Sequence, residues 1–401
     1  MTPTLQLSQL RDRYRHELFD VVLPFWDRHG IDHQFGGFLC GLDHDGKLVH
    51  SDKFHWYMGR GLWVYSFLYN HFGRDPHHLE IARKAKEFWL RFGPQPDGWW
   101  AETLRRDGRV ARPFSGDVYG MYFTAEGLQE YAFAAGDEQA LGMATAVMKQ
   151  LFQYAGTLEV RPQGMWMVSL RIATQMLRRW DDPALNAIAD YALDAIVNRH
   201  YNPDIGLNNE VLTRSFERPQ EEATKCQLGH SIETLWMVMD EAGRRGDSSL
   251  RDTAIARIRH HLHVGWDHIH GGIAEWINVD QGGYAWPEEN PIGTDLAFRM
   301  VGEYNYVKSL WSLNEILIAM LMIFRETKAG WAAEWFETVQ KTIDEKFSLK
   351  RYGYPLWLLF TGRKITFQPH TARQDNYHQV RQLMLCLLIV EEMLAGSRGT
   401  A

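Results

Sequence analysis

The sequence predicts an all-α protein: an (α/α)6 barrel, a toroid of about twelve helices with short β-hairpins at one rim. Apolar residues recur with helical spacing along most of the 401 residues. Glycine-marked segments with strand and turn signals recur about every 45–80 residues between pairs of helices. Alternate helices are apolar nearly all round, as expected of an inner ring. No linker rich in Pro, Gly or Ser divides the chain, so we expect one domain spanning residues 1–401.

The expected helices follow one another with short connections. A helix pair cannot bury its apolar face alone, so the pairs must pack together, either as a closed ring or as an open superhelical stack. We favour the ring because of the apolar alternate helices. The expected helices span residues 6–29, 53–72, 77–92, 116–135, 137–154, 165–179, 183–199, 220–243, 248–263, 304–326, 330–346 and 373–395.

Hairpins are expected where glycines and Asp-Gly turns stand beside short apolar runs. Each hairpin would follow a helix pair, so that the hairpins gather at one rim of the ring. They lie at residues 36–46, 98–108, 206–208, 271–283 and 353–362, with a fainter copy at residues 157–163.

The composition argues against several classes of partner. The net charge is −7, and acidic and basic residues are interspersed, which argues against binding to nucleic acid or to anionic membranes. No apolar stretch reaches the ~18 residues of a membrane-spanning helix. Residues 1–19 are polar and of mixed charge, unlike a signal peptide. Cys40, Cys226 and Cys386 are widely spaced, which predicts reduced thiols in a cytoplasmic protein.

Histidines on two apolar helices are the first candidates for catalysis. His230 and Glu233 lie three positions apart on one helix face, where a carboxylate would orient the imidazole and raise its pKa. His378 and Arg381 share a face at the start of the last helix, whose free N–H groups and dipole suit an oxyanion. The structural alternatives are a surface ion pair for His230 and Glu233, and a helix cap for Asp375.

Two more inner helices carry candidates, Glu315 for catalysis, and Lys308 with Trp311, and Arg60 with Trp63, for substrate binding. Glu315 shares an apolar helix with Lys308 and Trp311, and a buried Glu needs a partner, for which Lys308 and Arg60 are the structural alternatives. Arg60 lies among small and apolar residues near Trp63, where it would clamp a sugar hydroxyl or an enolate oxygen, unless it is a surface arginine.

Weaker candidates are Asp117, which is otherwise a helix cap, and Tyr119 beside it. The chain also has 16 tryptophans, some of which are expected to stack on the apolar faces of a sugar. The 18 histidines include no HExxH motif and no Cys/His cluster with ligand spacing, so we expect no metal and no other cofactor.

Taken together, these segments resemble the N-acylglucosamine 2-epimerase superfamily of sugar epimerases and aldose–ketose isomerases, over most of the chain. Any one motif is weak, but their order and spacing are specific. The matching segments are Phe25-Trp26, Gly36-Gly37-Phe38, Asp45-Gly46-Lys47, Lys53, Gly59-Arg60 with Leu62-Trp63, Gly229-His230 with Glu233, Gly265-Trp266-Asp267 with Gly271-Gly272, Lys308 with Trp311 and Glu315, and Tyr377-His378 with Arg381.

The resemblance implies an (α/α)6 fold, a metal-independent reaction, and His230 and His378 as the catalytic pair, with Arg60, Glu233 and Glu315 around them. A proton would move at C2 of an aldose after ring opening, through an enediolate. We assign His378 as the base at C2. We assign His230, held by Glu233, as the acid–base for ring opening. Arg60 and Arg381 are the candidates for stabilising the enediolate oxygen.

Departures from the family pattern leave the substrate open. Leu313 stands where N-acylglucosamine epimerases often carry a histidine. Residues 368–375 differ from the Gly/Pro/Lys-rich stretch that those enzymes link to nucleotide activation. The segment Met165–Arg171 lacks a histidine seen in mannose isomerases and cellobiose epimerases. We therefore expect a monosaccharide substrate, either mannose-type or of the N-acetylmannosamine/N-acetylglucosamine type, and a monomer or homodimer.

Two alternatives belong to other functional classes. A glycoside hydrolase or lyase on the same barrel would need two carboxylates across the sugar, for which Asp117 and Glu315 are the candidates. A relative without catalysis would bind a carbohydrate or a protein, because the fold alone does not determine function.

Overall fold

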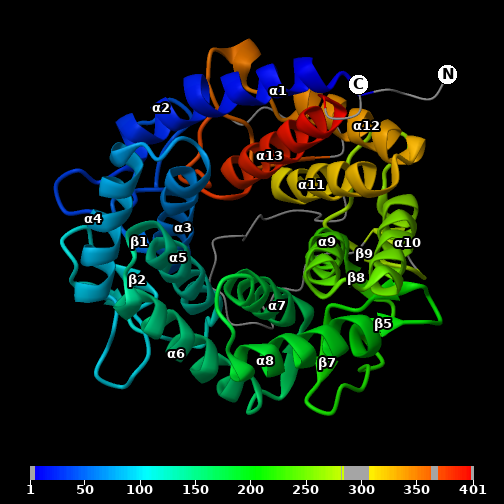
Figure 1. Cartoon of the computed structure of the whole chain (residues 1–401), viewed down its shortest axis with the longest axis horizontal. Helices are drawn as coiled ribbons and strands as arrows, with labels where there is room; N and C mark the ends of the chain where they lie inside the picture. The colour runs from blue at the N-terminus through cyan, green and yellow to red at the C-terminus, as the bar shows by residue number, and fades with distance from the viewer. Residues whose placement is uncertain (1–4, 281, 284–306, 363–368, 399–401) are drawn as a thin grey trace.

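The computed structural model describes residues 5–280, 282–283, 307–362 and 369–398. Within these residues, all twelve expected helices are present and circle a central space (Figure 1). The inner ring consists of α3 (His55–His71), α5 (Tyr119–Ala135), α7 (Gln163–Leu177), α9 (Leu228–Arg245), α11 (Leu310–Thr327) and α13 (His378–Arg398).

The outer ring contains the intervening helices, and several of them begin at an aspartate cap. Asp75, Asp137, Asp182 and Asp247 each accept a backbone N–H in the first turn of the helix that follows. The outer elements are α1 (Leu7–His16), which continues through η1 (Glu17–Val22), α2 (Leu23–Phe25) and η2 (Trp26–Gly30), then α4 (Pro76–Phe92), α6 (Glu138–Ala155), α8 (Pro183–Asp194) with η3 (Ala195–His200), α10 (Ser248–Gly265) and α12 (Gly330–Lys346).

The ring is closed, which excludes the open stack. Each inner helix contacts the next, from α3 through α5, α7, α9 and α11 to α13, and α13 in turn contacts α3. Two glycines allow the closest of these approaches. A Cβ atom at Gly59 of α3 would lie 2.3 Å from the backbone of Phe123 on α5, and one at Gly127 of α5 would lie 2.6 Å from the carbonyl oxygen of Gly59.

Burial separates the two rings as the sequence pattern predicts. Residues 119–132 of α5 are all buried, and so are residues 312–323 of α11. The outer helix α4 instead buries one stripe at helical spacing, which includes Ile81, Ala85, Phe88 and Trp89. Among the described residues, no helix is both long and apolar enough to cross a lipid bilayer.

Short strands lead into four of the inner helices, so they gather at the end of the ring where those helices begin. β1 (Lys53–Phe54) precedes α3 and pairs with β2 (Thr103–Leu104), which pairs with β3 (Val110–Arg112). The other strands are β4 (Val160–Pro162) with β7 (Val211–Thr213), β5 (Tyr201–Asn202) with β6 (Leu207–Asn208), β8 (Lys225–Gln227) with β9 (Trp276–Asn278) and β10 (Gly282–Gly283), and β11 (Lys308–Ser309) with β12 (Phe360–Thr361). A short 3-10 helix, η5, spans Lys350–Tyr352.

Several predicted boundaries are wrong. The helix expected at 220–243 begins only at Leu228, because residues 225–227 form β8 and pair with β9. The helix expected at 373–395 begins at His378, after a turn at Asp375. Residues 304–306 of the helix expected at 304–326 lie outside the described residues. The fainter hairpin at 157–163 is not a local hairpin, since β4 pairs with β7 about fifty residues later.

Candidate active site

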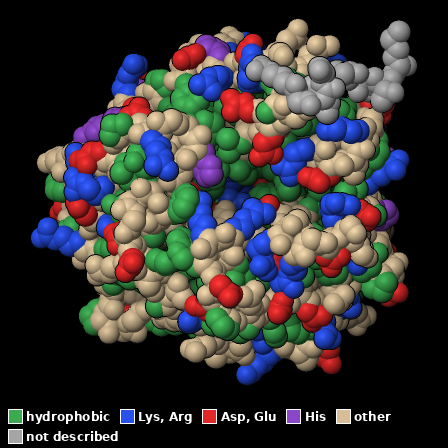
Figure 2. Space-filling model, viewed as in Figure 1, with side chains coloured by type: hydrophobic (Ala, Val, Ile, Leu, Met, Phe, Trp, Pro, Cys, Tyr) green, Lys and Arg blue, Asp and Glu red, His purple; other side chains and the backbone are tan. Residues whose placement is uncertain are grey.

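A cavity lies at the centre of the ring, close to where the strands meet the inner helices. The space-filling view is hollowed there, and Lys and Arg side chains gather around the hollow (Figure 2). All six inner helices contribute to the wall. The lining includes Trp56 and Arg60 from α3, Tyr119, Phe123 and Glu126 from α5, Met167 and Arg171 from α7, His230 and Glu233 from α9, Trp311 and Asn314 from α11, and His378 and Arg381 from α13.

His230 faces this cavity from the first turn of α9, and Glu210 holds its imidazole. Nδ1 of His230 lies 3.1 Å from Oε1 of Glu210. Glu233 instead pairs with the guanidinium of Arg381, at 2.5 Å. The expectation that Glu233 holds His230 is therefore wrong. Helical spacing places the two side chains on one face, but a charged donor on a facing helix takes the carboxylate.

His378 faces the cavity from the start of α13 and also has a carboxylate partner. Its Nδ1 lies 2.5 Å from Oδ2 of Asp375. The other oxygen of Asp375 accepts the backbone N–H of Tyr377, at 2.9 Å. Asp375 thus both caps the turn before the helix and orients the imidazole, so the cap alternative covers only half of its role.

The two histidines lie on either side of Trp311. The ring centroid of Trp311 is 5.3 Å from that of His230 and 5.8 Å from that of His378. The pKa values of the two imidazoles are shifted in opposite directions. Burial lowers the pKa of His230, but the carboxylate of Glu210 outweighs this, so the pKa is raised overall. At His378 burial prevails over Asp375, with help from the charge of Arg60, and the pKa is lowered.

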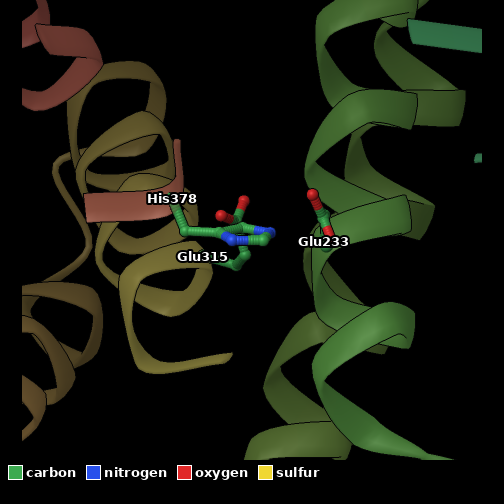
Figure 3. Close-up of side chains that lie close together, drawn as sticks. All are labelled: Glu233, Glu315 and His378. Carbon is green, nitrogen blue, oxygen red and sulfur yellow. The ribbon is translucent and has the colours of Figure 1, made fainter. Parts of the chain in front are cut away.

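A shared arginine connects two carboxylates beside the histidines. Nη2 of Arg381 lies 2.5 Å from Glu233 and 2.6 Å from Glu315, and Nε1 of Trp236 donates to Glu315 at 3.0 Å. In Figure 3, Glu315 and His378 come from one side and Glu233 comes from α9 on the other. Arg381 is therefore the partner of Glu315, and the two alternatives of Lys308 and Arg60 are wrong.

A second network extends this cluster across the ring. Tyr377 donates to Oε2 of Glu126 at 2.8 Å and accepts from Nη1 of Arg381 at 3.1 Å. Nε of Arg171 donates to the same Glu126 at 2.7 Å. The network therefore joins α5, α7 and α13, and its hydrogen bonds compensate the cost of burying these charges.

Arg60 differs from Arg171 and Arg381, the other buried arginines of the cavity wall, because it lacks an ion-pair partner among the described residues. Its guanidinium carbon lies 4.0 Å from the ring centroid of Phe123, 4.8 Å from that of Tyr377 and 5.0 Å from that of Trp56. Nε and Nη1 of Arg60 are buried without a hydrogen-bond partner in the described part of the chain. Arg60 is 5% exposed and lines the cavity, so it is not a surface arginine.

The family model described as N-acylglucosamine 2-epimerase (GlcNAc 2-epimerase) matches residues 36–167. The N-acylglucosamine 2-epimerase of Mus musculus is 26% identical, over 97% of this chain and 93% of its own length. The chain is therefore similar to N-acylglucosamine 2-epimerases over nearly its whole length. The cellobiose 2-epimerase of Bacteroides fragilis is 27% identical over 60% of this chain and 68% of its own length.

Solved structures of sugar isomerases and epimerases share the fold of this chain. The crystal structure of a D-mannose isomerase superposes with a TM-score of 0.80 at 12% identity, covering 98% of this chain and all of that one. The closed ring of helices is thus the (α/α)6 barrel predicted from the sequence, and the resemblance seen in the motifs is confirmed.

Two other predicted site residues, Lys308 and Asp117, lie behind the cavity wall. The ammonium group of Lys308 bonds to Asp267 at 2.8 Å and to the carbonyl of Gly271, so it joins the loop after α10 to β11. Asp117 is bound by His55 at 3.1 Å and by Trp56 at 2.8 Å. Neither Lys308 nor Asp117 lines the cavity.

Trp63 and Asp117 were expected to bind the substrate, but neither side chain lines the cavity. Trp63 is fully buried and packs edge-on against Tyr377, with centroids 5.5 Å apart, so it supports a wall residue instead of meeting the cavity. Tyr119 does line the cavity. Because Asp117 is held behind Trp56, the carboxylate pair of Asp117 and Glu315 that a hydrolase would use does not face one shared space.

Glu233, Glu315 and His378 each offer a ligand atom within 4.8 Å of the others, so this cluster was weighed as a metal site. The guanidinium of Arg381 already contacts both carboxylates and supplies the positive charge that a metal ion would bring. The donor set therefore fits an arginine-centred ion pair better than a divalent cation.

Sequence reasoning missed Glu126 on α5 and two loop carboxylates of the cavity wall, Glu210 and Glu275. Glu275 lines the wall near His230, accepts a hydrogen bond from Ser309, and has a pKa raised by burial. Glu210 and Glu275 each lie in a loop beside a short strand, where helical periodicity gives no signal. The Asn-Asn-Glu run that ends at Glu210 was the one local hint, because three polar residues stand between two strand signals.

Proposed function

We propose that this protein is a metal-independent epimerase or aldose–ketose isomerase that moves a proton at C2 of a monosaccharide. The substrate is an aldose of the mannose type or of the N-acetylmannosamine/N-acetylglucosamine type. The similarity of the chain to N-acylglucosamine 2-epimerases supports this class of reaction. The observation that carries the proposal is a single cavity with two imidazoles, each held at Nδ1 by a carboxylate.

Both imidazoles present Nε2 as the free nitrogen, because Nδ1 is engaged in each. In the proposed reaction, His230 moves a proton between O1 and the ring oxygen, which opens the pyranose to the free aldehyde. His378 then removes the proton from C2, and the electron pair of that C–H bond forms the enediolate. The lowered pKa of His378 favours the neutral form that a base needs, and the raised pKa of His230 favours the protonated form that an acid needs.

Arg60 is the donor best suited to the enediolate oxygen. Arg381, the other candidate, already contacts Glu233, Glu315 and Tyr377. Arg60 keeps buried N–H groups without a partner among the described residues, and the surrounding rings exclude water from them. A donor positioned in this way stabilises charge that appears only in the transition state.

The fate of the proton determines the product. If a proton returns to C2 from the opposite face, the product is the 2-epimer. If the proton is delivered to C1 instead, and the O2 proton moves to O1, the product is the ketose. Both outcomes use the same residues and the same enediolate.

The reaction is tested by incubating the protein with mannose, glucose, fructose and N-acetylmannosamine in D2O. Proton and carbon NMR should show deuterium at C2 of an epimer, or at C1 of a ketose. His230→Asn and His378→Asn should each lower the exchange rate by on the order of 10³-fold while circular dichroism shows a folded protein. Exchange at the wild-type rate in both variants would contradict the mechanism. Cleavage of an oligosaccharide without exchange would support the hydrolase alternative.

We propose that the enzyme acts in the cytoplasm as a monomer or homodimer. Cys40, Cys226 and Cys386 support a reducing compartment, since all three are buried and none forms a disulfide within the described residues.

A further inference from the structure

We propose that Glu210 is the positioning residue of His230, fixing the imidazole with its proton on Nδ1 and its Nε2 toward the sugar. This inference rests on the proposed function, in which His230 transfers the ring-opening proton. The histidine lies on the inner helix α9, whereas the carboxylate lies in the turn between β6 and β7, twenty residues earlier.

Backbone pairing holds Glu210 in place. Glu210 directly precedes β7, whose first residue Val211 pairs with Pro162 of β4. The carbonyl oxygen of Glu210 accepts the backbone N–H of Gln163 at 2.8 Å. Asn209, the preceding residue, donates from its side chain to the carbonyl oxygens of residues 222, 223 and 225. The carboxylate therefore projects from a backbone fixed on both sides.

The surroundings of His230 are shaped to this contact. A Cβ atom at Gly164 would lie 2.4 Å from the hydroxyl oxygen of Tyr119 and 3.2 Å from Cε1 of His230, so the glycine allows the imidazole to lie against the start of α7. Glu210 is 5% exposed and lines the cavity. The partner of His230 is therefore a shielded carboxylate at one edge of the imidazole.

Other charged and titratable groups also face His230, but among the described residues Glu210 is the one in hydrogen-bond contact. Glu233 lies on its own helix, Glu275 lies in the segment before β9, and Tyr119 lies on α5. Glu233 is bound to Arg381, and Glu275 accepts a hydrogen bond from Ser309. Glu210 therefore sets the tautomer, while the other carboxylates add only to the field around the imidazole.

The test compares wild type with Glu210→Gln and Glu210→Asp, and uses Glu217→Gln, an exposed residue in the turn after β7, as the matched control. Glu210→Gln should lower kcat by on the order of 10²-fold with little change in KM. Because the carboxylate raises the pKa of His230, the alkaline limb of the kcat/KM profile should move to lower pH. Glu210→Asp keeps the charge, so its kcat and the pH of its alkaline limb should lie between those of Glu210→Gln and wild type. Glu217→Gln should match wild type.

A second measurement does not depend on catalysis. In protein labelled with 15N-histidine, the His230 signals, assigned by their loss in His230→Asn, should titrate at lower pH in Glu210→Gln than in wild type. An unchanged titration and an unchanged alkaline limb would overturn the role of Glu210, even if kcat fell. If wild type exchanges no proton with any sugar, the proposed function fails, and the 15N titration alone still decides whether Glu210 controls His230.

Discussion

At the residue scale, the chemistry of this site depends on which nitrogen of each imidazole is engaged. Asp375 and Glu210 bind Nδ1 of His378 and His230, and both residues reach their histidine from outside the helix that carries it. The two environments shift the histidine pKa values apart, and such a separation assigns an acid and a base within one cavity.

Asp375→Asn tests the base. The carboxylate of Asp375 raises the pKa of His378 against the effect of burial, so its neutralisation should lower that pKa further. A base loses activity below its pKa, so the acid limb of the kcat/KM profile should move to lower pH. The rate at the optimum should fall by about 10-fold to 100-fold, since a less basic and less oriented imidazole abstracts the C2 proton more slowly.

The asparagine keeps an oxygen that can accept the N–H of Tyr377, so the turn before α13 should survive. Thermal unfolding is the control for this point. An acid limb at the wild-type pH would show that Asp375 only caps the turn.

At the element scale, the inner helices depend on close approach and the outer helices on their caps. Gly59 and Gly127 bring the backbones of α3 and α5 together next to Arg60 and Phe123. The position of the guanidinium over the ring of Phe123 follows from this crossing. A small residue on an inner helix thus determines where a charged side chain meets the cavity.

Gly59→Ala should therefore reduce both stability and activity. The added methyl group would lie 2.3 Å from the backbone of Phe123, so α3 must move away from α5. We expect the free energy of unfolding in urea to fall by about 1–3 kcal/mol. The matched control is Gly142→Ala on the outer helix α6, where a methyl group meets nothing within 4 Å. That variant should gain about 0.5–1 kcal/mol with unchanged activity. Equal stability of the two variants would contradict this account.

At the scale of the whole molecule, charges as well as apolar packing hold the ring together. Arg381 of α13 contacts Glu233 of α9 and Glu315 of α11, and Tyr377 connects the same cluster to Glu126 of α5. Since Arg171 of α7 also binds Glu126, five of the six inner helices meet in one buried network. Such networks are costly to desolvate, so the stability of the barrel should depend on pH.

Glu315 provides the test. Burial raises its pKa to about 7, although Arg381 opposes this shift. The unfolded carboxyl titrates near 4.5, so between these pH values the folded protein keeps a proton that the unfolded chain has lost, and stability falls as pH rises. Glu315→Gln removes this loss. The free energy of unfolding of Glu315→Gln minus that of wild type should be larger at pH 8 than at pH 5, by on the order of 1 kcal/mol.

Urea unfolding at the two pH values measures this difference. Glu326→Gln, an exposed residue near the end of the same helix, should show none of it. A pH-independent difference for Glu315→Gln would mean that this carboxyl has an ordinary pKa in the folded protein.

The sequence alone determined the helix count, the alternation of inner and outer helices, and His230, His378 and Arg60 as residues of the cavity wall. These follow from local patterns, since helical periodicity places side chains on a face. The tertiary structure was needed to show which carboxylate pairs with which cationic side chain. Glu233 pairs with Arg381 across 148 residues of sequence, leaving His230 to Glu210. Which charges pair depends on the strength and geometry of contacts between separate elements. The spacing of residues along one helix carries no information about those contacts.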